Sequence, residues 1–120
     1  MKDFGHLRRV NQMIARIWRG TTRLSDADRY QGYLNHFVIP SCQSAEGNKG
    51  VYILKECQGE LVHFLLLSFW TSNEALVKHI GAEDDLVNPT PDEKSLLLAF
   101  ESNARHYELT HMFEGAVYKE

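Results

Sequence analysis

The sequence predicts an α+β fold whose elements follow one another in the order β-α-β-β-α-β. Three observations carry this prediction. The apolar run 64–70, Phe-Leu-Leu-Leu-Ser-Phe-Trp, lacks the alternation of a one-sided strand and predicts a strand buried on both faces. A polar stretch with helical spacing follows the run directly. Two further segments, 13–19 and 51–57, carry the β-branched and aromatic residues that are typical of strands.

The first half of the chain predicts one strand and one helix. The strand covers residues 13–19 and should end at Gly20. Ser25 is a candidate helix N-cap, because acidic residues follow it in the first turn. Pro40 lacks the backbone N–H that a helix interior needs, so the helix should stop or kink near Ile39.

A hairpin and a short helix are predicted next. The turn 58–60, Gln-Gly-Glu, is short enough to join the strand 51–57 to the central strand. Thr71 can cap the short helix, and Glu74 stands where it can bond back to the backbone N–H of that cap. Gly81 follows where the helix should end. The apolar side of this helix comprises Ala75, Leu76, His79 and Ile80.

The last part of the chain predicts another helix and a final strand. An acidic loop spans 82–90, and Pro91 is tolerated in the first turn of a helix that begins there. The buried side of that helix should comprise Leu96, Leu97 and Phe100. Residues 105–113 alternate enough to form the last strand.

Composition is typical of one soluble globular domain of 120 residues, with 24% charged and 43% apolar residues. We predict an N-terminal tail over 1–11, one domain over 12–116 and a C-terminal tail over 117–120. The net charge of −3 argues against nucleic acid as a partner. No apolar run reaches the roughly 20 residues that a membrane span requires. Cys42 and Cys57, without a signal peptide, predict free thiols and a cytoplasmic location.

The predicted sheet carries helices on one face, yet its central strand is apolar on both. The simplest cover for the second face is another copy of the same sheet, related by a two-fold axis. An uncovered apolar face would promote aggregation. We therefore expect a homodimer that forms through the open sheet face.

The stretch 64–75 resembles the strand-to-helix signature of the antibiotic biosynthesis monooxygenase-like proteins, which belong to the dimeric α+β barrel superfamily. The resemblance extends over about residues 13 to 114. It implies a ferredoxin-like fold, a four-stranded antiparallel sheet with helices on one face, whose copies pair as a dimeric α+β barrel. Members of the superfamily include cofactor-independent oxygenases, haem-degrading enzymes and many proteins with no assigned activity. The other matching segments are 14–18, 30–40, 47–50, 81–84 and 105–108.

Resemblance to the quinone-forming oxygenases implies that Trp70 helps to hold a phenolic substrate against the sheet. The alternative is a core aromatic residue whose N–H binds a carbonyl. The Asn, Tyr and Arg partners of those oxygenases are not recognisable around Trp70, where Leu66 and Leu76 stand instead. We predict Trp70 and His79 as catalytic residues. The predicted substrate-binding residues are Arg16, Trp18, Tyr30, Leu66 and His106.

Each polar residue of this set also has a structural interpretation. His79 could act as a base near neutral pH or be a satisfied core or interface histidine. Arg16 shares a face with Trp18 and could hold a phenolate or carboxylate, or it could be solvated at an edge. His106 could instead make a structural hydrogen bond. Cys42 has no evident base partner and is predicted to be inert.

Haem degradation in the superfamily uses an Asn in the first strand, a Trp in the short helix and a haem-ligating His after it. The sequence has Ile17 or Trp18, His79 and Asn88-Pro89 near these places, so it departs from all three. The histidines lack HxH or HExxH spacing and the cysteines lack CxxC spacing, so no metal site is predicted. We predict that no cofactor is bound.

Two functions of different classes remain open. The first is a cofactor-independent monooxygenase that oxidises a small phenolic, hydroquinone or anthrone-type substrate with O2 in a cavity between sheet and helices. The second is a non-catalytic, dimeric small-ligand-binding or stress-associated protein of the same fold. The missing partner residues favour the second function, whereas the resemblance along the chain favours the first.

Overall fold

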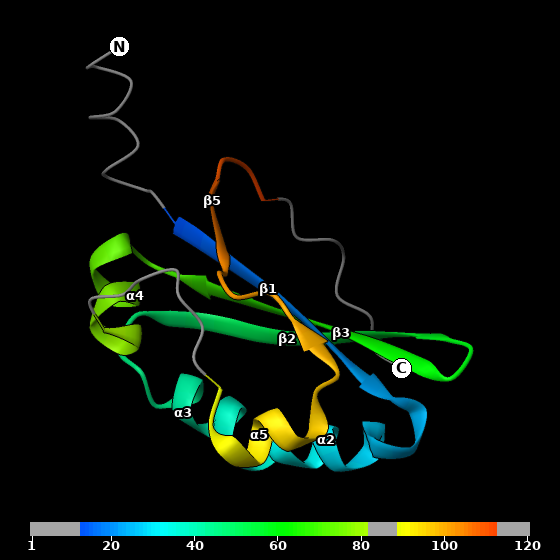
Figure 1. The fold of residues 1–120 in the computed structure, drawn as a ribbon. Helices are drawn as coiled ribbons and strands as arrows, with labels where there is room; N and C mark the ends of the chain where they lie inside the picture. The colour runs from blue at the N-terminus through cyan, green and yellow to red at the C-terminus, as the bar shows by residue number, and fades with distance from the viewer. Residues whose placement is uncertain (1–12, 82–88, 113–120) are drawn as a thin grey trace, which may run out of the picture.

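The computed structural model describes residues 13–81 and 89–112 (Figure 1). The predicted tails over 1–11 and 117–120 lie outside the described residues, as do both bounds of the predicted domain and most of the loop 82–90. Within the described residues, no helix is long and apolar enough to cross a membrane.

One antiparallel sheet forms the upper layer of the molecule in Figure 1. Its centre is β1 (Met13–Arg23), which pairs with β3 (Leu61–Trp70) along its whole length. Beyond β3 lies β2 (Asn48–Gln58), the partner of β3 in the predicted hairpin. The other side of β1 pairs with β4 (Ala99–Phe100) and β5 (Arg105–Leu109). The predicted antiparallel α+β fold is confirmed.

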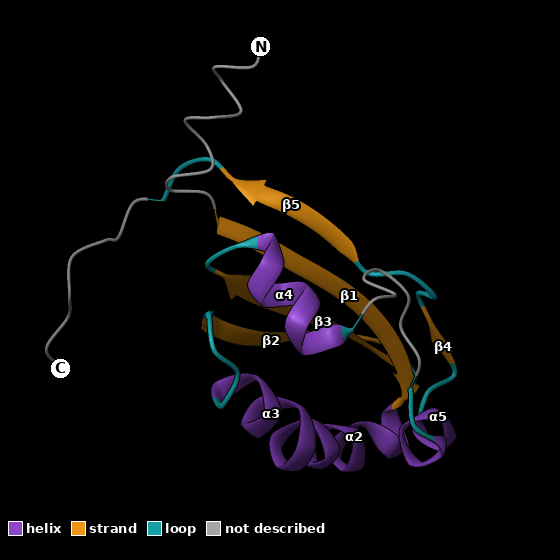
Figure 2. Ribbon diagram, turned by 90° about the vertical axis from the view of Figure 1, so that its left-hand side faces the viewer, coloured by secondary structure: helices purple, strands orange, loops and turns teal. Residues whose placement is uncertain are grey.

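The helices lie on one side of the sheet (Figures 1 and 2). Helix α2 (Ala27–Tyr33) follows a 3-10 turn, η1 (Leu24–Asp26), and continues through a π-helical segment into α3. These elements and α5 lie below the sheet, whereas α4 packs at the end where β1 begins and β3 ends. The remaining bounds are Leu34–Val38 for the π-helical segment η2, Ile39–Gln43 for α3, Asn73–Ile80 for α4 and Pro91–Leu96 for α5.

Two buried clusters lie between the sheet and the helices. The larger cluster packs α2 against the middle of the sheet and comprises Trp18, Ala27, Tyr30, Leu34, Val62, Phe64 and Ala104. The smaller cluster packs α3 and α4 against the end of the sheet and comprises Ile14, Cys42, Trp70 and Leu76. Because side chains alternate along a strand, the positions between these clusters also face the helices.

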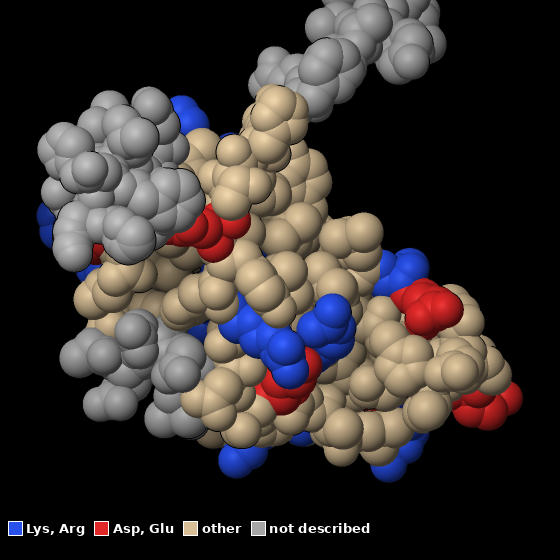
Figure 3. Space-filling model, turned by 90° about the horizontal axis from the view of Figure 1, so that it is seen from above, with Lys and Arg blue, Asp and Glu red and all other residues tan. Residues whose placement is uncertain are grey.

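The opposite face of the sheet is only partly buried within the described chain, so the prediction that β3 is buried on both faces depends on the predicted second copy, which a single chain does not test. Leu65, Leu67 and Phe69 of β3 are only partly buried, because no helix covers them. Tyr52 and Leu54 on β2 are 56% and 51% exposed. Figure 3 looks onto the molecule from this side and shows wide uncharged areas between the charged groups.

Gly81 is the C-cap of α4, as predicted, whereas both predicted N-caps are wrong in detail. Ser25 lies inside η1, and α2 follows Asp26, whose carboxylate binds Arg29 at 2.9 Å instead of capping the helix. The cap of α4 is Ser72, whose Oγ accepts a hydrogen bond of 3.1 Å from the backbone N–H of Ala75. Thr71, the predicted cap, instead donates its backbone N–H to the carbonyl of Gly47. In each case the residue after the predicted cap occupies the N-cap position.

The first helix does not stop before Pro40. The α-helical pattern gives way to the π-helical segment Leu34–Val38 and then resumes, so that Pro40 stands in the first turn of α3. The missing N–H of a proline is tolerated there, because the first N–H groups of a helix have no partner within it. The helix therefore continues to Gln43.

Leu97 and Phe100 do not belong to the last helix, which ends at Leu96. The chain returns to the sheet: Phe100 pairs with Gly20, and the N–H of Leu98 donates to the carbonyl of Thr21 at 2.8 Å. β4 thus pairs part of an edge of β1 that would otherwise be open. A short apolar run cannot be assigned to helix or strand by periodicity alone.

Gly20 does not end the first strand, which runs to Arg23. A Cβ atom at Gly20 would lie 3.0 Å from Leu97 Cδ2 and 3.1 Å from the Trp18 ring. Close packing, rather than a turn, therefore favours glycine at this position.

Candidate functional site

The candidate site lies on the helix-facing side of the sheet, between the two buried clusters. Arg16 on β1 is paired in register with Ser68 on β3 and with His106 on β5. Trp18, the next residue on this side of β1, is paired with Leu66. Arg16, Leu66, Ser68 and His106 are all only partly buried. The structure therefore brings four of the predicted substrate-binding residues together across three adjacent strands.

The predicted catalytic residues Trp70 and His79 are in contact. Trp70 ends β3 and is 1% exposed, and its ring centroid lies 4.9 Å from that of His79 at an interplanar angle of 31°. The indole N–H donates a hydrogen bond of 2.9 Å to Ser68 Oγ. In this structure the Trp70 ring is therefore packed within the protein, and its N–H group is already engaged.

The electrostatic environment favours the neutral form of His79. Burial lowers the pKa of His79, and the nearby positive charge of Arg16 lowers it further. A neutral imidazole can accept a proton at neutral pH. This position therefore suits a general base.

Cys42 on α3 joins this group, although the sequence offered no base partner for it. Its Sγ lies 4.0 Å from His79 Nε2, and the side chain is 8% exposed. Burial raises the pKa of the Cys42 thiol, and the positive charge of Arg16 opposes that effect. A thiol with a raised pKa is protonated at neutral pH, so Cys42 supplies an apolar contact rather than a nucleophile there.

Tyr30 and Trp18 are anchored by hydrogen bonds within the protein. Tyr30 is fully buried, its hydroxyl donates to Glu93 Oε2 at 2.9 Å, and its ring meets Phe64 edge-on. Trp18 is 3% exposed and donates its indole N–H to the carbonyl of Glu101. Both residues therefore belong to the larger buried cluster, next to the candidate site.

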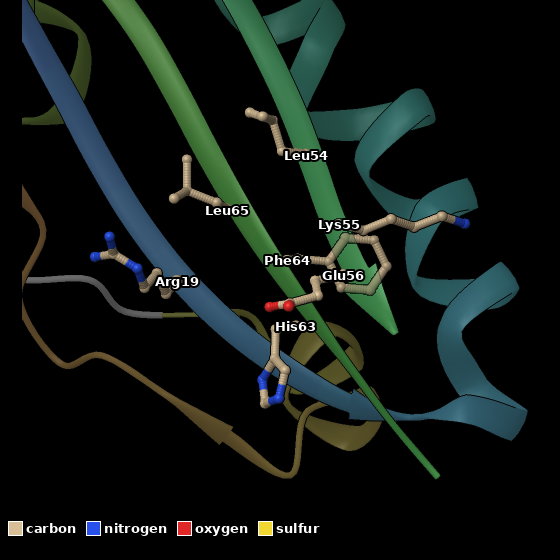
Figure 4. Close-up of a pocket in the computed structure, with 7 residues that line it drawn as sticks. All are labelled: Arg19, Leu54, Lys55, Glu56, His63, Phe64 and Leu65. Atoms are coloured by element: carbon tan, nitrogen blue, oxygen red, sulfur yellow. The ribbon is translucent and has the colours of Figure 1, made fainter. Parts of the chain in front are cut away.

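One surface hollow adjoins His79, and another lies elsewhere on the sheet. One of about 290 Å³ adjoins His79 at the outer edge of α4 and is lined by Ala45, Glu46, Ala75, Lys78 and His79. Another, of about 300 Å³, lies over β1, β2 and β3 (Figure 4), and its lining includes neither Trp70 nor His79. It is lined by Arg19, Leu54, Lys55, Glu56, His63, Phe64 and Leu65. Across residues 13–81 and 89–112, no three His, Cys, Asp or Glu side chains gather to hold a metal ion.

Ser68 and Cys42 are the residues of this group that sequence reasoning missed. The position of Ser68, two residues before Trp70 on the same face of a strand, is a signal that the sequence does contain. The position of Cys42 beside His79 depends on how α3 packs, and no local pattern indicates it.

No protein-family model matches the sequence, and no curated protein is similar to it in sequence. Solved structures do share its fold. A candidate antibiotic biosynthesis monooxygenase from Bacillus cereus matches with a TM-score of 0.61 and 14% identity, over 88% of this chain and 100% of that one. A protein of unknown function from Nitrosomonas europaea matches with a TM-score of 0.62 and 13% identity, over 88% and 97% of the two chains.

A variant of SnoaB, a cofactor-independent oxygenase from Streptomyces nogalater, also matches. Its TM-score is 0.56 at 12% identity, over 85% of this chain and 95% of that chain. At such identities the likeness establishes the fold, and it agrees with the fold that the resemblance in the sequence predicts.

Proposed function

We propose that the protein is a cofactor-independent monooxygenase. Its substrate would be a small phenol, hydroquinone or anthrone, which it would oxidise with O2 on the helix-facing side of the sheet. The observation that carries the proposal is the contact between Trp70 and His79, in which burial and Arg16 keep the imidazole neutral. The shared fold with a cofactor-independent oxygenase supports it.

In the proposed reaction, His79 takes the acidic proton of the substrate. Arg16 would hold the resulting anion by its positive charge, and the partly buried Leu66 would provide an apolar wall for the aromatic rings, with the Trp70 ring behind it holding His79 in place. The anion gives one electron to O2, and the two radicals combine at carbon to form a peroxide anion. The peroxide takes back the proton from His79 and loses water to leave a quinone. One O2 is consumed, one oxygen atom enters the product and the other leaves as water, so the step needs no external reductant.

We also propose that the protein is a homodimer that forms through the open sheet face and works in the cytoplasm. The exposed apolar side chains of β2, with Tyr107 of β5 at 48% exposure, support the interface. Covering such a patch with a second copy removes apolar surface from water. The free thiols of Cys42 and Cys57 are in keeping with a reducing compartment.

The second candidate is a small-ligand-binding protein without turnover. It is favoured by the Trp70 N–H, which is engaged by Ser68, and by Leu66, which supplies no polar group beside it. Such a site could hold an apolar aromatic molecule by shape alone.

Oxygen uptake distinguishes the two candidates. Anthrones and naphthohydroquinones would be added to metal-free, flavin-free protein, with Trp70→Phe, His79→Ala and the control His36→Ala run beside the wild type. His36 is exposed and lies on η2, away from the Trp70–His79 contact. We expect uptake above the autoxidation blank that His79→Ala loses and His36→Ala keeps. No uptake from any substrate, with the fold intact, would support the binding protein.

A further inference from the structure

The hydroxyl of Ser68 has a hydrogen-bonding capacity that the fold uses only in part. Its oxygen accepts the Trp70 N–H at 2.9 Å. A serine hydroxyl also carries one hydrogen of its own, and an indole N–H cannot accept it because it is a donor only. Among the residues that the structure describes, Ser68 has no acceptor for this hydrogen.

The location of Ser68 makes this donor available to a ligand. Ser68 stands on the helix-facing side of β3, with Leu66 before it and Trp70 after it on the same side. Its register partners are Arg16 on β1 and Val51 on β2. Ser68 is partly buried, whereas Trp70 is 1% exposed. The Ser68 hydroxyl is thus a polar group between two apolar side chains of β3, and its register partner on β1 is the positively charged Arg16.

Accepting the indole hydrogen makes Ser68 a better donor. Consecutive hydrogen bonds polarise one another, and the effect is larger where water is partly excluded. With its oxygen accepting the Trp70 N–H, the Ser68 hydroxyl can donate its own hydrogen to an oxygen atom of a ligand. The positive charge of Arg16 would favour a ligand oxygen that carries negative charge.

We propose that Ser68 is a substrate-binding residue, which donates a hydrogen bond to the phenolic or carbonyl oxygen of an aromatic ligand. Trp70 then acts as a positioning residue through Ser68. The inference rests on the proposed function for the identity of the ligand, and it adds to that function a polar contact that is not among the predicted site residues.

The test is ligand binding without O2, measured by calorimetry on the full chain. The two probes are 1-naphthol and 1-methylnaphthalene, which have similar shapes but differ in the oxygen. We expect Ser68→Ala to weaken 1-naphthol binding about three- to tenfold, the effect of one hydrogen bond, and to change 1-methylnaphthalene binding less than twofold. Ser68→Thr, which keeps a hydroxyl, should retain 1-naphthol binding.

Two further variants keep the test decisive. Ser68→Cys preserves the size of the side chain with a much weaker donor, so it should behave as Ser68→Ala does even where the alanine variant folds poorly. Ser102→Ala, on an exposed residue outside the site, should bind both probes as the wild type does. Circular dichroism would confirm the fold of each variant.

Equal losses for both probes would overturn the proposal, because they would mean that Ser68 only holds the Trp70 ring in place. The proposal is also overturned if the wild type does not bind 1-naphthol or if Ser68→Ala binds it unchanged. Oxygen uptake is a separate measurement. A naphthol-selective loss in Ser68→Ala without any uptake would support the Ser68 contact and contradict the monooxygenase.

Discussion

The Tyr30 hydroxyl donates a buried hydrogen bond of 2.9 Å to Glu93 Oε2, and this bond joins α2 to α5. Glu93 is 9% exposed and Tyr30 is fully buried. Thr90 supports the same junction, because its Oγ1 accepts the N–H of Glu93 and contacts the Tyr33 hydroxyl at 3.0 Å. The junction fixes α5 beneath the sheet, next to the larger buried cluster.

The Glu93 carboxyl should make stability depend on pH. Burial raises the pKa of the Glu93 carboxyl above the unfolded value of about 4.5. Hydrogen bonds with the Tyr30 side chain and with the backbone of Thr90 oppose this effect. A raised folded-state pKa gives stability that is present below the unfolded pKa and is lost as pH rises through the folded pKa. Glu93→Gln removes this titration. In urea unfolding, the free energy of unfolding of the wild type should therefore fall relative to that of Glu93→Gln as the pH rises from 4 to 7.5.

Asp92→Asn is the control for this titration, because Asp92 is exposed on the same helix. Its difference from the wild type should change little over the same range. A wild type that gains stability relative to Glu93→Gln as pH rises would contradict the burial argument.

Removing the Tyr30 hydroxyl should destabilise the fold. Tyr30→Phe keeps the ring against Phe64 but leaves the buried Glu93 carboxyl without this donor, at a cost of about 1–3 kcal/mol. Tyr33→Phe removes a hydroxyl that binds Thr90 in an exposed place and should cost less. Equal free energies of unfolding for the two variants would show that the buried hydrogen bond stabilises the fold no more than the exposed one does.

Two glycines allow a direct test of close packing. A Cβ at Gly20 would meet Leu97 at 3.0 Å and Trp18 at 3.1 Å, so Gly20→Ala should destabilise by about 1–3 kcal/mol. Gly32 lies in α2 with nothing within 4 Å of its Cβ position. Gly32→Ala should instead stabilise the helix by about 0.5–1 kcal/mol. Thermal unfolding of both variants measures the contrast, and a shift of the same sign in both would refute it.

The open sheet face should control assembly. Leu54→Lys replaces an apolar side chain that is 51% exposed on β2 with a charged one. We expect the wild type to run as the proposed dimer and Leu54→Lys as a monomer in light scattering after gel filtration. Phe37→Lys changes a side chain that is 63% exposed on the helix side and should leave the dimer intact. A monomeric wild type, or a dimer that only Phe37→Lys disrupts, would place any interface elsewhere.

Local patterns predict the strand and helix around Trp70 and His79 because the residues that determine them are close in sequence. The apolar run fixes β3 as a strand, and the polar residues after it fix α4. The register between strands follows from the hairpin turn and from which side chains are buried. These signals are contained in short windows, so the predicted fold is confirmed even though both helix N-caps are shifted.

Long-range contacts could not be predicted in the same way. Cys42 and His79 are 37 residues apart, and Tyr30 and Glu93 are 63 residues apart. Their meeting depends on how α3 and α5 dock beneath the sheet, which single-sequence periodicity does not specify. Leu97 to Phe100 illustrates the same limit, because an apolar run after a helix fits either a longer helix or a return to the sheet.

The pH dependence of oxygen uptake should identify His79 as the base. Because burial and Arg16 lower the pKa of His79, activity should fall only as pH drops below the usual histidine value of about 6.5. Arg16→Gln removes the positive charge, so the pKa of His79 and the acid limb of the profile should both move to higher pH. Arg16→Lys keeps the charge and should leave the limb in place, even if its loss of guanidinium geometry raises KM. An NMR titration of His79 in each variant gives the same pKa without turnover, which separates a base from a residue that only shapes the site. An acid limb that ignores the charge at Arg16 while the NMR titration follows it would assign the catalytic proton to another group.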